Sequence, residues 1–209
     1  MKKIFVVMVC LTMSSAAYAQ FGGFFDKVKE NLPGGPNSSV SSEQLVKKYT
    51  VSAGHTLNAH ARLLSAFGLK EMSETIDAKA RHLTEGTLSG KEIEETEKVI
   101  TESTKALQEK FADEKTVLDE EGRKEYNEGR VNLAQASLAY TDTALDAKNY
   151  KPGIRSINTT GRLAINIGKK LPGDIKNLKT VIGMVKEYSK ANNIEDDDEL
   201  DDATSKLPF

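Results

Sequence analysis

Cysteine is almost absent from this chain of 209 residues, which has a single cysteine, Cys10, and no tryptophan. Cys10 lies in an apolar run near the N-terminus that we expect to be removed, so the mature chain would have no thiol. This excludes disulfides, thiolate metal ligands, a cysteine nucleophile and covalent haem attachment from the mature chain. About 190 residues bury enough apolar surface to fold without disulfides, even in an oxidising compartment.

Long apolar runs are also lacking. The run from Ile4 to Met13 is too short to span a bilayer, which takes about 20 apolar residues. It follows Met1-Lys2-Lys3 and precedes Ala17-Tyr18-Ala19, the order of parts in a secretory signal that is cleaved after the second alanine. The sequence therefore predicts a signal peptide over residues 1–19 and no transmembrane span in the mature chain. We expect a periplasmic protein or, alternatively, a secreted one.

Neither sign of charge is in large excess over the whole chain. The 29 Lys and Arg residues face 31 Asp and Glu residues, so composition gives no reason to expect nucleic acid as a partner. The distribution is uneven, however, because residues 151–190 are strongly basic and residues 195–202 form a dense acidic run. Charge runs of this kind are typically solvated, which predicts a disordered acidic tail over residues 194–209.

Strand signals are missing, since no segment alternates apolar and polar residues between hairpin turns. Apolar residues recur instead at helical spacing, which predicts an all-α fold: a helical bundle of about five or six helices over residues 41–193. The expected helices cover residues 41–67, 70–84, 91–113, 119–149, 154–171 and 175–192, with Thr116 as an alternative start of the fourth. Periodicity leaves open whether the third and fourth of these are continuous.

Glycine, proline and capping residues mark the predicted helix ends. Ser41 and Ser89 are expected to cap the first and third helices, and Pro172-Gly173-Asp174 to stop the fifth and cap the sixth. The helix over Glu120–Asn149 is apolar over more than half of its circumference, which predicts that it is the central one. Arg130 lies within that arc, and its burial would require a partner, an inward carboxylate or a ligand anion.

The segment that precedes the bundle combines glycine, proline and phenylalanine. Residues 20–40 carry Phe21, Phe24 and Phe25, followed by a Pro/Gly/Ser stretch typical of a linker. We expect a flexible N-terminal arm. The three aromatic rings are candidates for docking into a groove of the bundle, onto a partner protein or onto a bilayer surface.

Histidine is scarce, with His55, His60 and His82 as the only three. The first two are five residues apart and so lie on different faces of one helix, and neither helix-borne ligand spacing, H-x-x-x-H or E-x-x-H, occurs. No metal site and no cofactor is predicted. A b-type haem held between Met72 or Met184 and His82 or His60 is an alternative that spacing does not test.

Basic residues of the last two predicted helices carry the most specific functional signal. Helices with apolar stripes and an almost uniformly positive outer surface suit a ligand that is both apolar and anionic, such as a phospholipid or lipopolysaccharide. The candidate binding residues are Arg155, Arg162, Lys169, Lys170, Lys176, Lys179 and Lys186. The acidic tail is expected to fold back and compete with such a ligand.

Catalytic motifs are missing too, because the sequence has no serine elbow, no assembled S-x-x-K set and no phosphate loop. We therefore predict a non-catalytic helical protein of the cell envelope that binds a partner protein or an amphipathic anionic, lipid-like ligand. A small haem or metal carrier that uses histidine and methionine is the alternative. An enzyme of unknown type is the third candidate, and the oligomeric state is not indicated.

Overall fold

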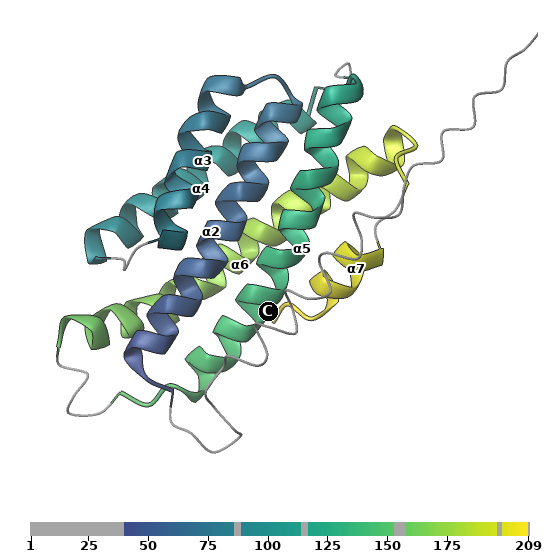
Figure 1. The fold of residues 1–209 in the computed structure, drawn as a ribbon. Coiled ribbons are helices and arrows are strands. Elements are labelled where there is room, and N and C mark those ends of the chain that lie inside the picture. The colour runs from purple at the N-terminus through teal and green to yellow at the C-terminus, as the bar shows by residue number, and fades with distance from the viewer. Residues whose placement is uncertain (1–39, 86–88, 114–116, 153–157, 196–197, 209) are drawn as a thin grey trace, which may run out of the picture. The chain divides into compact units, whose positions relative to one another are not determined.

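The computed structural model describes residues 40–85, 89–113, 117–152, 158–195 and 198–208, and within them every regular element is a helix (Figure 1). The predicted all-α helical bundle is confirmed. None of the described helices is long and apolar enough to cross a membrane. The predicted signal peptide and arm, including Phe21, Phe24 and Phe25, lie outside the described residues. The helices are α2 (Ser42–Ala66), α3 (Lys70–Glu85), α4 (Gly90–Phe111), α5 (Glu120–Asn149), α6 (Thr159–Ala191) and α7 (Asp198–Ser205).

Local hydrogen bonds explain where the first helices begin. Ser41 Oγ accepts from the Gln44 N–H at 3.1 Å, and Ser89 forms a capping box in which its N–H donates to the Glu92 carboxylate at 2.7 Å. Asp119 caps α5 by accepting from the Gly122 N–H at 2.7 Å. Because α4 ends at Phe111 and α5 begins at Glu120, the third and fourth helices are separate.

Contacts between helix ends establish the direction of each helix. The ring of Phe67, just after α2, lies 4.8 Å from that of Phe111 at the end of α4 and 5.4 Å from that of Tyr188 near the end of α6. The last turns of α2, α4 and α6 are therefore adjacent. In contrast, Ser52 early in α2 is bonded to Thr143 late in α5 at 2.9 Å. Thus α2, α4 and α6 run in one direction and α5 runs in the opposite one.

The central helix is α2, which packs against α3, α4, α5 and α6. The prediction that Glu120–Asn149 is the central helix is wrong, because α5 packs mainly against α2, α6 and α7. Its wide apolar arc has a different explanation: α7 covers a side that would otherwise face solvent. The sequence-based prediction missed this helix, since α7 lies in the segment predicted to be disordered.

Gly129 allows α5 to approach α2 closely. A Cβ atom at this position would lie 2.8 Å from both Cγ and Cδ2 of Leu63, well inside the usual separation of about 3.5–4 Å between carbon atoms. We expect Gly129→Ala to lower the free energy of unfolding by about 1–3 kcal/mol through overpacking, as measured by urea denaturation. The control is Gly183→Ala, also in a helix, where a Cβ meets nothing within 4 Å. Equal losses in both variants would contradict the close approach.

The basic segment forms one uninterrupted helix, α6, with Pro172 inside it. The prediction of two helices separated at Pro172-Gly173-Asp174 is therefore wrong. Proline lacks an N–H, and its ring collides with the carbonyl four residues earlier. Here that carbonyl belongs to Gly168, which is exposed like Pro172, so water can bond the carbonyl that lacks a helical N–H partner. Ile175 and Leu178, both buried in the following turn, hold the second half against the core.

Part of the acidic segment is also ordered. The prediction of a disordered tail over residues 194–209 is corrected for residues 198–205, which form α7 and pack mainly on α5. Leu200, Ala203 and Leu207 recur at helical spacing and are 2%, 0% and 7% exposed. Burial of this short apolar stripe opposes the repulsion between the acidic residues around it.

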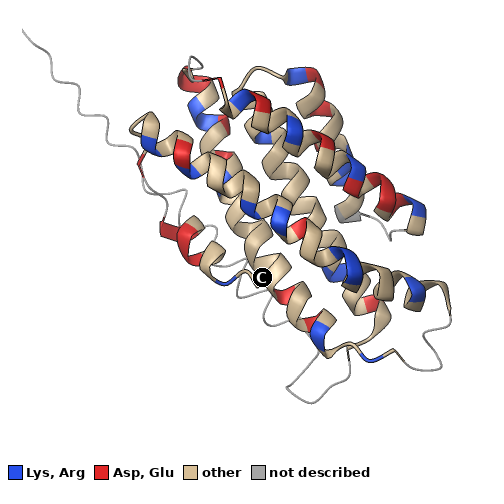
Figure 2. Ribbon diagram, turned by 180° about the vertical axis from the view of Figure 1, so that it is seen from behind, with Lys and Arg blue, Asp and Glu red and all other residues tan. Residues whose placement is uncertain are grey.

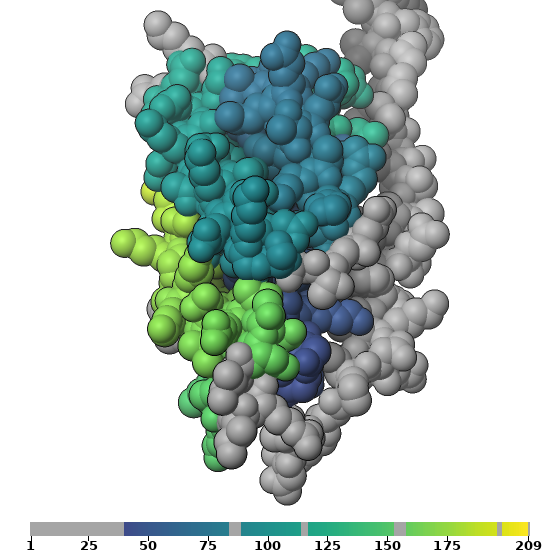
Figure 3. All heavy atoms as spheres, turned by 90° about the vertical axis from the view of Figure 1, so that its left-hand side faces the viewer, coloured from purple at the N-terminus to yellow at the C-terminus, as the bar shows by residue number. Residues whose placement is uncertain are grey.

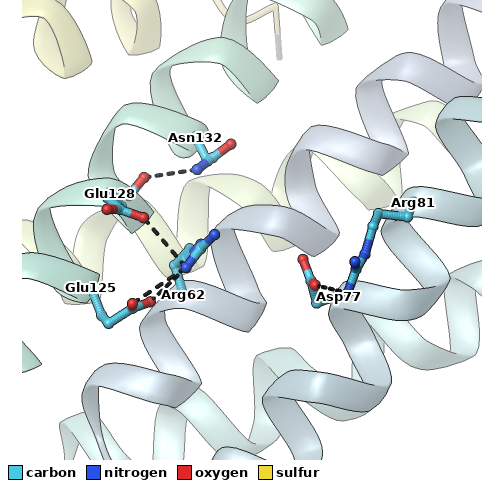
Figure 4. A network of polar contacts seen from close by, with 6 residues as sticks. All are labelled: Arg62, Asp77, Arg81, Glu125, Glu128 and Asn132. Carbon is cyan, nitrogen blue, oxygen red and sulfur yellow. Dashed lines mark hydrogen bonds and ion pairs between the residues drawn. The ribbon is translucent and has the colours of Figure 1, made fainter. Parts of the chain in front are cut away.

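Arg62 connects α2 to α5 at the surface (Figure 4). Its Nη1 lies 3.1 Å from Glu125 Oε2 and 3.4 Å from Glu128 Oε2. A second pair, Arg81 with Asp77 at 2.5 Å, lies within α3. Exposed ion pairs contribute little to stability, so we attribute the packing of α2 against α5 to the core contacts.

Candidate ligand-binding face

Three of the predicted cations form an exposed stripe along α6. Arg162, Lys169 and Lys176 are seven residues apart, which is close to two helical turns, so consecutive members lie about 10 Å apart along the axis. All three side chains are exposed, and the structure shows no ion pair to any of them among the residues that it describes. Gly173, which is also exposed, lies on the same side of the helix and adds no side chain between Lys169 and Lys176. We call these three residues the cationic stripe.

The other predicted cations of α6 are bound to neighbouring elements. Lys170 pairs with Glu97 of α4, and Lys186 Nζ lies 2.5 Å from Asp201 Oδ1 of α7. Lys179 Nζ donates to the carbonyl of Leu207 at 3.5 Å. The structure thus divides the predicted set into exposed and engaged members. Arg155 lies outside the described residues.

An open hollow of about 440 Å³ adjoins the cationic stripe. Pro172 and Ile175 give it an apolar lining, which Lys176, Lys179 and Thr180 complete. An apolar surface with a few positive groups beside it is complementary to a molecule that has an apolar part and an anionic part. Lys176 belongs to both features, so the stripe and the hollow form one continuous face.

This face lies between α4 and α7. In Figure 2 basic residues recur along α6, and the acidic residues of α7 lie to one side of it. Figure 3 shows the first half of α6, in green, directly beside α4, in teal, in agreement with the pairing of Lys170 with Glu97. The exposed acidic residue of α6 itself is Glu187, near its C-terminal end. The cationic stripe, from Arg162 to Lys176, lies in about the first half of the helix, away from Glu187.

Beneath α6 lies a buried polar group, Asp174. This residue is 6% exposed, and its carboxylate accepts from the Tyr49 hydroxyl at 3.0 Å. Burial raises the pKa of Asp174 to about 7, and the nearby Glu97 carboxylate acts in the same direction, against the Tyr49 hydrogen bond and Lys170. Asp174 does not line the hollow at Pro172 and Ile175. We therefore assign it to the core rather than to the binding face.

A second buried titratable residue is His60, which is 0% exposed. Its Nδ1 lies 2.7 Å from Ser103 Oγ. Because that hydroxyl donates to the carbonyl of Val99 at 2.7 Å, it accepts from Nδ1–H, which identifies the neutral tautomer protonated at Nδ1. Burial lowers the pKa of His60 to about 3.

The structure does not bring the histidines together. His60 lies in the core, whereas His82 is exposed and contacts Glu92 at 3.2 Å. His55 is partly buried, which lowers its pKa. Within the described ranges, no group of three or more His, Cys, Asp and Glu side chains is placed to hold a metal ion.

Arg130 is buried at 7% exposure, as its place in the apolar arc of α5 suggested. Its Nη2 donates to the carbonyl of Glu195 at 2.8 Å and its Nη1 to Asn127 Oδ1 at 3.4 Å. Neither of these two acceptors is a carboxylate or a ligand anion. Arg130 instead connects α5 to the segment that leads into α7.

No protein-family model, curated protein or solved structure matches this chain. Sequence reasoning missed two features of this region. The first is helix α7, which the spacing of Leu200, Ala203 and Leu207 could have indicated. The second is the burial of Asp174, since no local pattern shows whether this residue caps a helix or lies in the core.

Proposed function

We propose that this protein is an exported, non-catalytic binding protein of the cell envelope. Its ligand is an amphipathic anion, such as a phospholipid or the lipid part of lipopolysaccharide, held on the outer face of α6. The observation that carries the proposal is the cationic stripe, unpaired within the described residues and continuous with the apolar hollow at Pro172 and Ile175.

The length of the cationic stripe favours an extended anionic surface over a single small anion. Arg162 and Lys176 are separated by about 20 Å along the helix axis, which exceeds the reach of one phosphate group. Each basic residue near an anionic membrane surface contributes about 1 kcal/mol to binding. Three such contributions give useful affinity without insertion, and the apolar side of α6 remains in the core.

The hollow supplies the apolar part of the recognition. Its volume of about 440 Å³ falls within the usual range of about 300–1,000 Å³ for small-molecule sites. Since it is open, it suits one end of an acyl chain or a glycerol backbone better than a whole lipid. We therefore expect binding at a surface, with dissociation favoured by salt because the attraction is largely between exposed charges.

Vesicle sedimentation of the mature protein tests this proposal. Wild-type protein is expected to bind vesicles of phosphatidylglycerol and phosphatidylcholine, and not vesicles of phosphatidylcholine alone, at low ionic strength. The triple variant R162Q/K169Q/K176Q is expected to bind on the order of 100-fold more weakly, since three contributions of about 1 kcal/mol are lost.

The matched control is K105Q/K124Q/K148Q, which removes the same charge from exposed positions on α4 and α5. It should bind within about threefold of wild type if the face on α6 is specific. Two results would overturn the proposal: no preference of the wild type for anionic vesicles, or equal losses in the two triple variants.

A further inference from the structure

Helix α7 is stabilised by its packing against the rest of the bundle. Its eight residues are too few for a stable isolated helix, and the four acidic residues Asp198, Glu199, Asp201 and Asp202 lie close enough to repel one another. What opposes this repulsion is burial of the apolar stripe Leu200, Ala203 and Leu207. Such a helix is stable on the bundle and unstable away from it.

Cations provide the polar contacts that hold α7 and its flanks to the bundle. Lys186 pairs with Asp201, Lys179 donates to the Leu207 carbonyl, and Arg130 donates to the Glu195 carbonyl. Two of these cations belong to α6, and Lys179 also lines the hollow that adjoins the cationic stripe. One of the cations that hold this segment, Lys179, therefore also belongs to the face that we propose for the ligand.

The chemistry of α7 parallels that of the proposed ligand. Both have an apolar side and several negative charges. The fit of α7 is incomplete, because a second open hollow of about 580 Å³ remains where α5, the end of α6 and α7 meet, lined among others by Arg130, Lys186, Lys190 and Asp201. An element with a small apolar contact and an open hollow beside it is a segment of low local stability.

We propose that α7 is an internal competitor for the anionic ligand. In the docked position it engages Lys179 and Lys186; an anionic surface bound at the cationic stripe displaces it and gains these two cations. This inference rests on the proposed function of the α6 face. It extends that function to regulation, because ligand affinity then depends on how firmly α7 is docked.

Two charge reversals within α7 separate this mechanism from a general effect of charge. Asp201→Lys repels Lys186 of α6, whereas the partner of Asp202 is Lys206, which directly follows α7 and lies 2.5 Å away. Both variants change the net charge equally and at neighbouring positions. In the vesicle assay D201K is expected to bind at least about fivefold more tightly than D202K, the gain corresponding to one released lysine.

Hydrogen exchange of the full-length mature wild type gives an independent measurement. Amides of residues 198–205 should exchange faster in the presence of anionic vesicles than with phosphatidylcholine vesicles, while amides of α2 remain protected. This readout does not depend on how either substitution affects folding.

The outcomes distinguish the two proposals. If the wild type and both variants fail to bind anionic vesicles, the proposed function fails, and the competition mechanism fails with it. If they bind, but D201K equals D202K and exchange in α7 is unchanged by vesicles, the binding face stands and α7 is only a structural element. Tighter binding of D201K together with faster exchange supports the competitor.

Discussion

Replacing Asp174 with asparagine is expected to stabilise the protein at pH 8 and to leave its stability almost unchanged below pH 4. The ordinary pKa of 3.8 rises to about 7 in the folded state because the carboxyl group is buried. The folded state therefore binds this proton more tightly than the unfolded state does. Its stabilising contribution is complete below pH 3.8 and is lost as the pH rises to about 7.

The magnitude follows from the same pKa change. A rise from 3.8 to about 7, at about 1.4 kcal/mol for each pH unit, sets an upper limit of about 4 kcal/mol. Asparagine keeps an oxygen that can accept from the Tyr49 hydroxyl and has no charge to bury. Urea denaturation between pH 4 and pH 8 measures the difference in the free energy of unfolding.

The control for Asp174 is Asp142→Asn, which removes an exposed carboxylate of α5. It should show no comparable gain across the same pH range. If D174N matched the wild type at pH 8, the carboxylate would already be well solvated or paired when ionised, and its assignment to the core would be wrong.

His60 is expected to change the free energy of unfolding with pH in the opposite direction to Asp174. Its ordinary pKa of 6.5 falls to about 3 on burial, so in between these values the unfolded state binds one proton more than the folded state. Stability is present above pH 6.5 and is lost as the pH falls toward 3. Between pH 6.5 and pH 4 this loss amounts to about 3 kcal/mol.

The variant His60→Gln should therefore reverse its rank with pH. At pH 7 it is expected to be about 1–2 kcal/mol less stable than the wild type, because the packing and the bond to Ser103 are disturbed. At pH 4 it should be the more stable of the two, since it has no imidazole to protonate on unfolding. His82→Gln, at an exposed position, is the control and should keep its rank.

The pH-dependent contributions of Asp174 and His60 to the stability of the wild type nearly cancel. Between pH 3.8 and pH 6.5, Asp174 and His60 give slopes of opposite sign, each about 1.4 kcal/mol per pH unit. We expect this pair to leave the free energy of unfolding of the wild type almost constant over this pH range. In D174N it should fall steeply as the pH falls, and in H60Q it should fall steeply as the pH rises. Parallel profiles for all three proteins would contradict both assignments.

Helix ends were predictable because their causes are local. Ser41 and Ser89 accept from N–H groups three residues ahead, and Gly68 takes a positive φ of 77° where α2 stops, a conformation that glycine adopts without cost. The all-α fold and most boundaries follow from such short-range bonds and from apolar spacing. The same reasoning singled out the candidate cations of α6, but it did not show which of them remain exposed.

Long-range contacts decided the remainder. Lys170 is engaged by Glu97, which is 73 residues away in sequence, and the Glu195 carbonyl that Arg130 bonds is 65 residues from it. No local pattern shows which lysines stay exposed when their partners lie on other helices. The same holds for burial of Asp174, which depends on Tyr49 from α2.

The sequence by itself determined the class of fold, the starts of the first four helices and the concentration of positive charge on the segment that becomes α6, because backbone bonding and apolar periodicity act within a few residues. Only the tertiary structure decided that Pro172 continues a helix and that an acidic segment folds as α7. Both outcomes depend on burial: the core contacts of Ile175 and Leu178, and of Leu200 and Leu207, outweigh local preferences that point the other way.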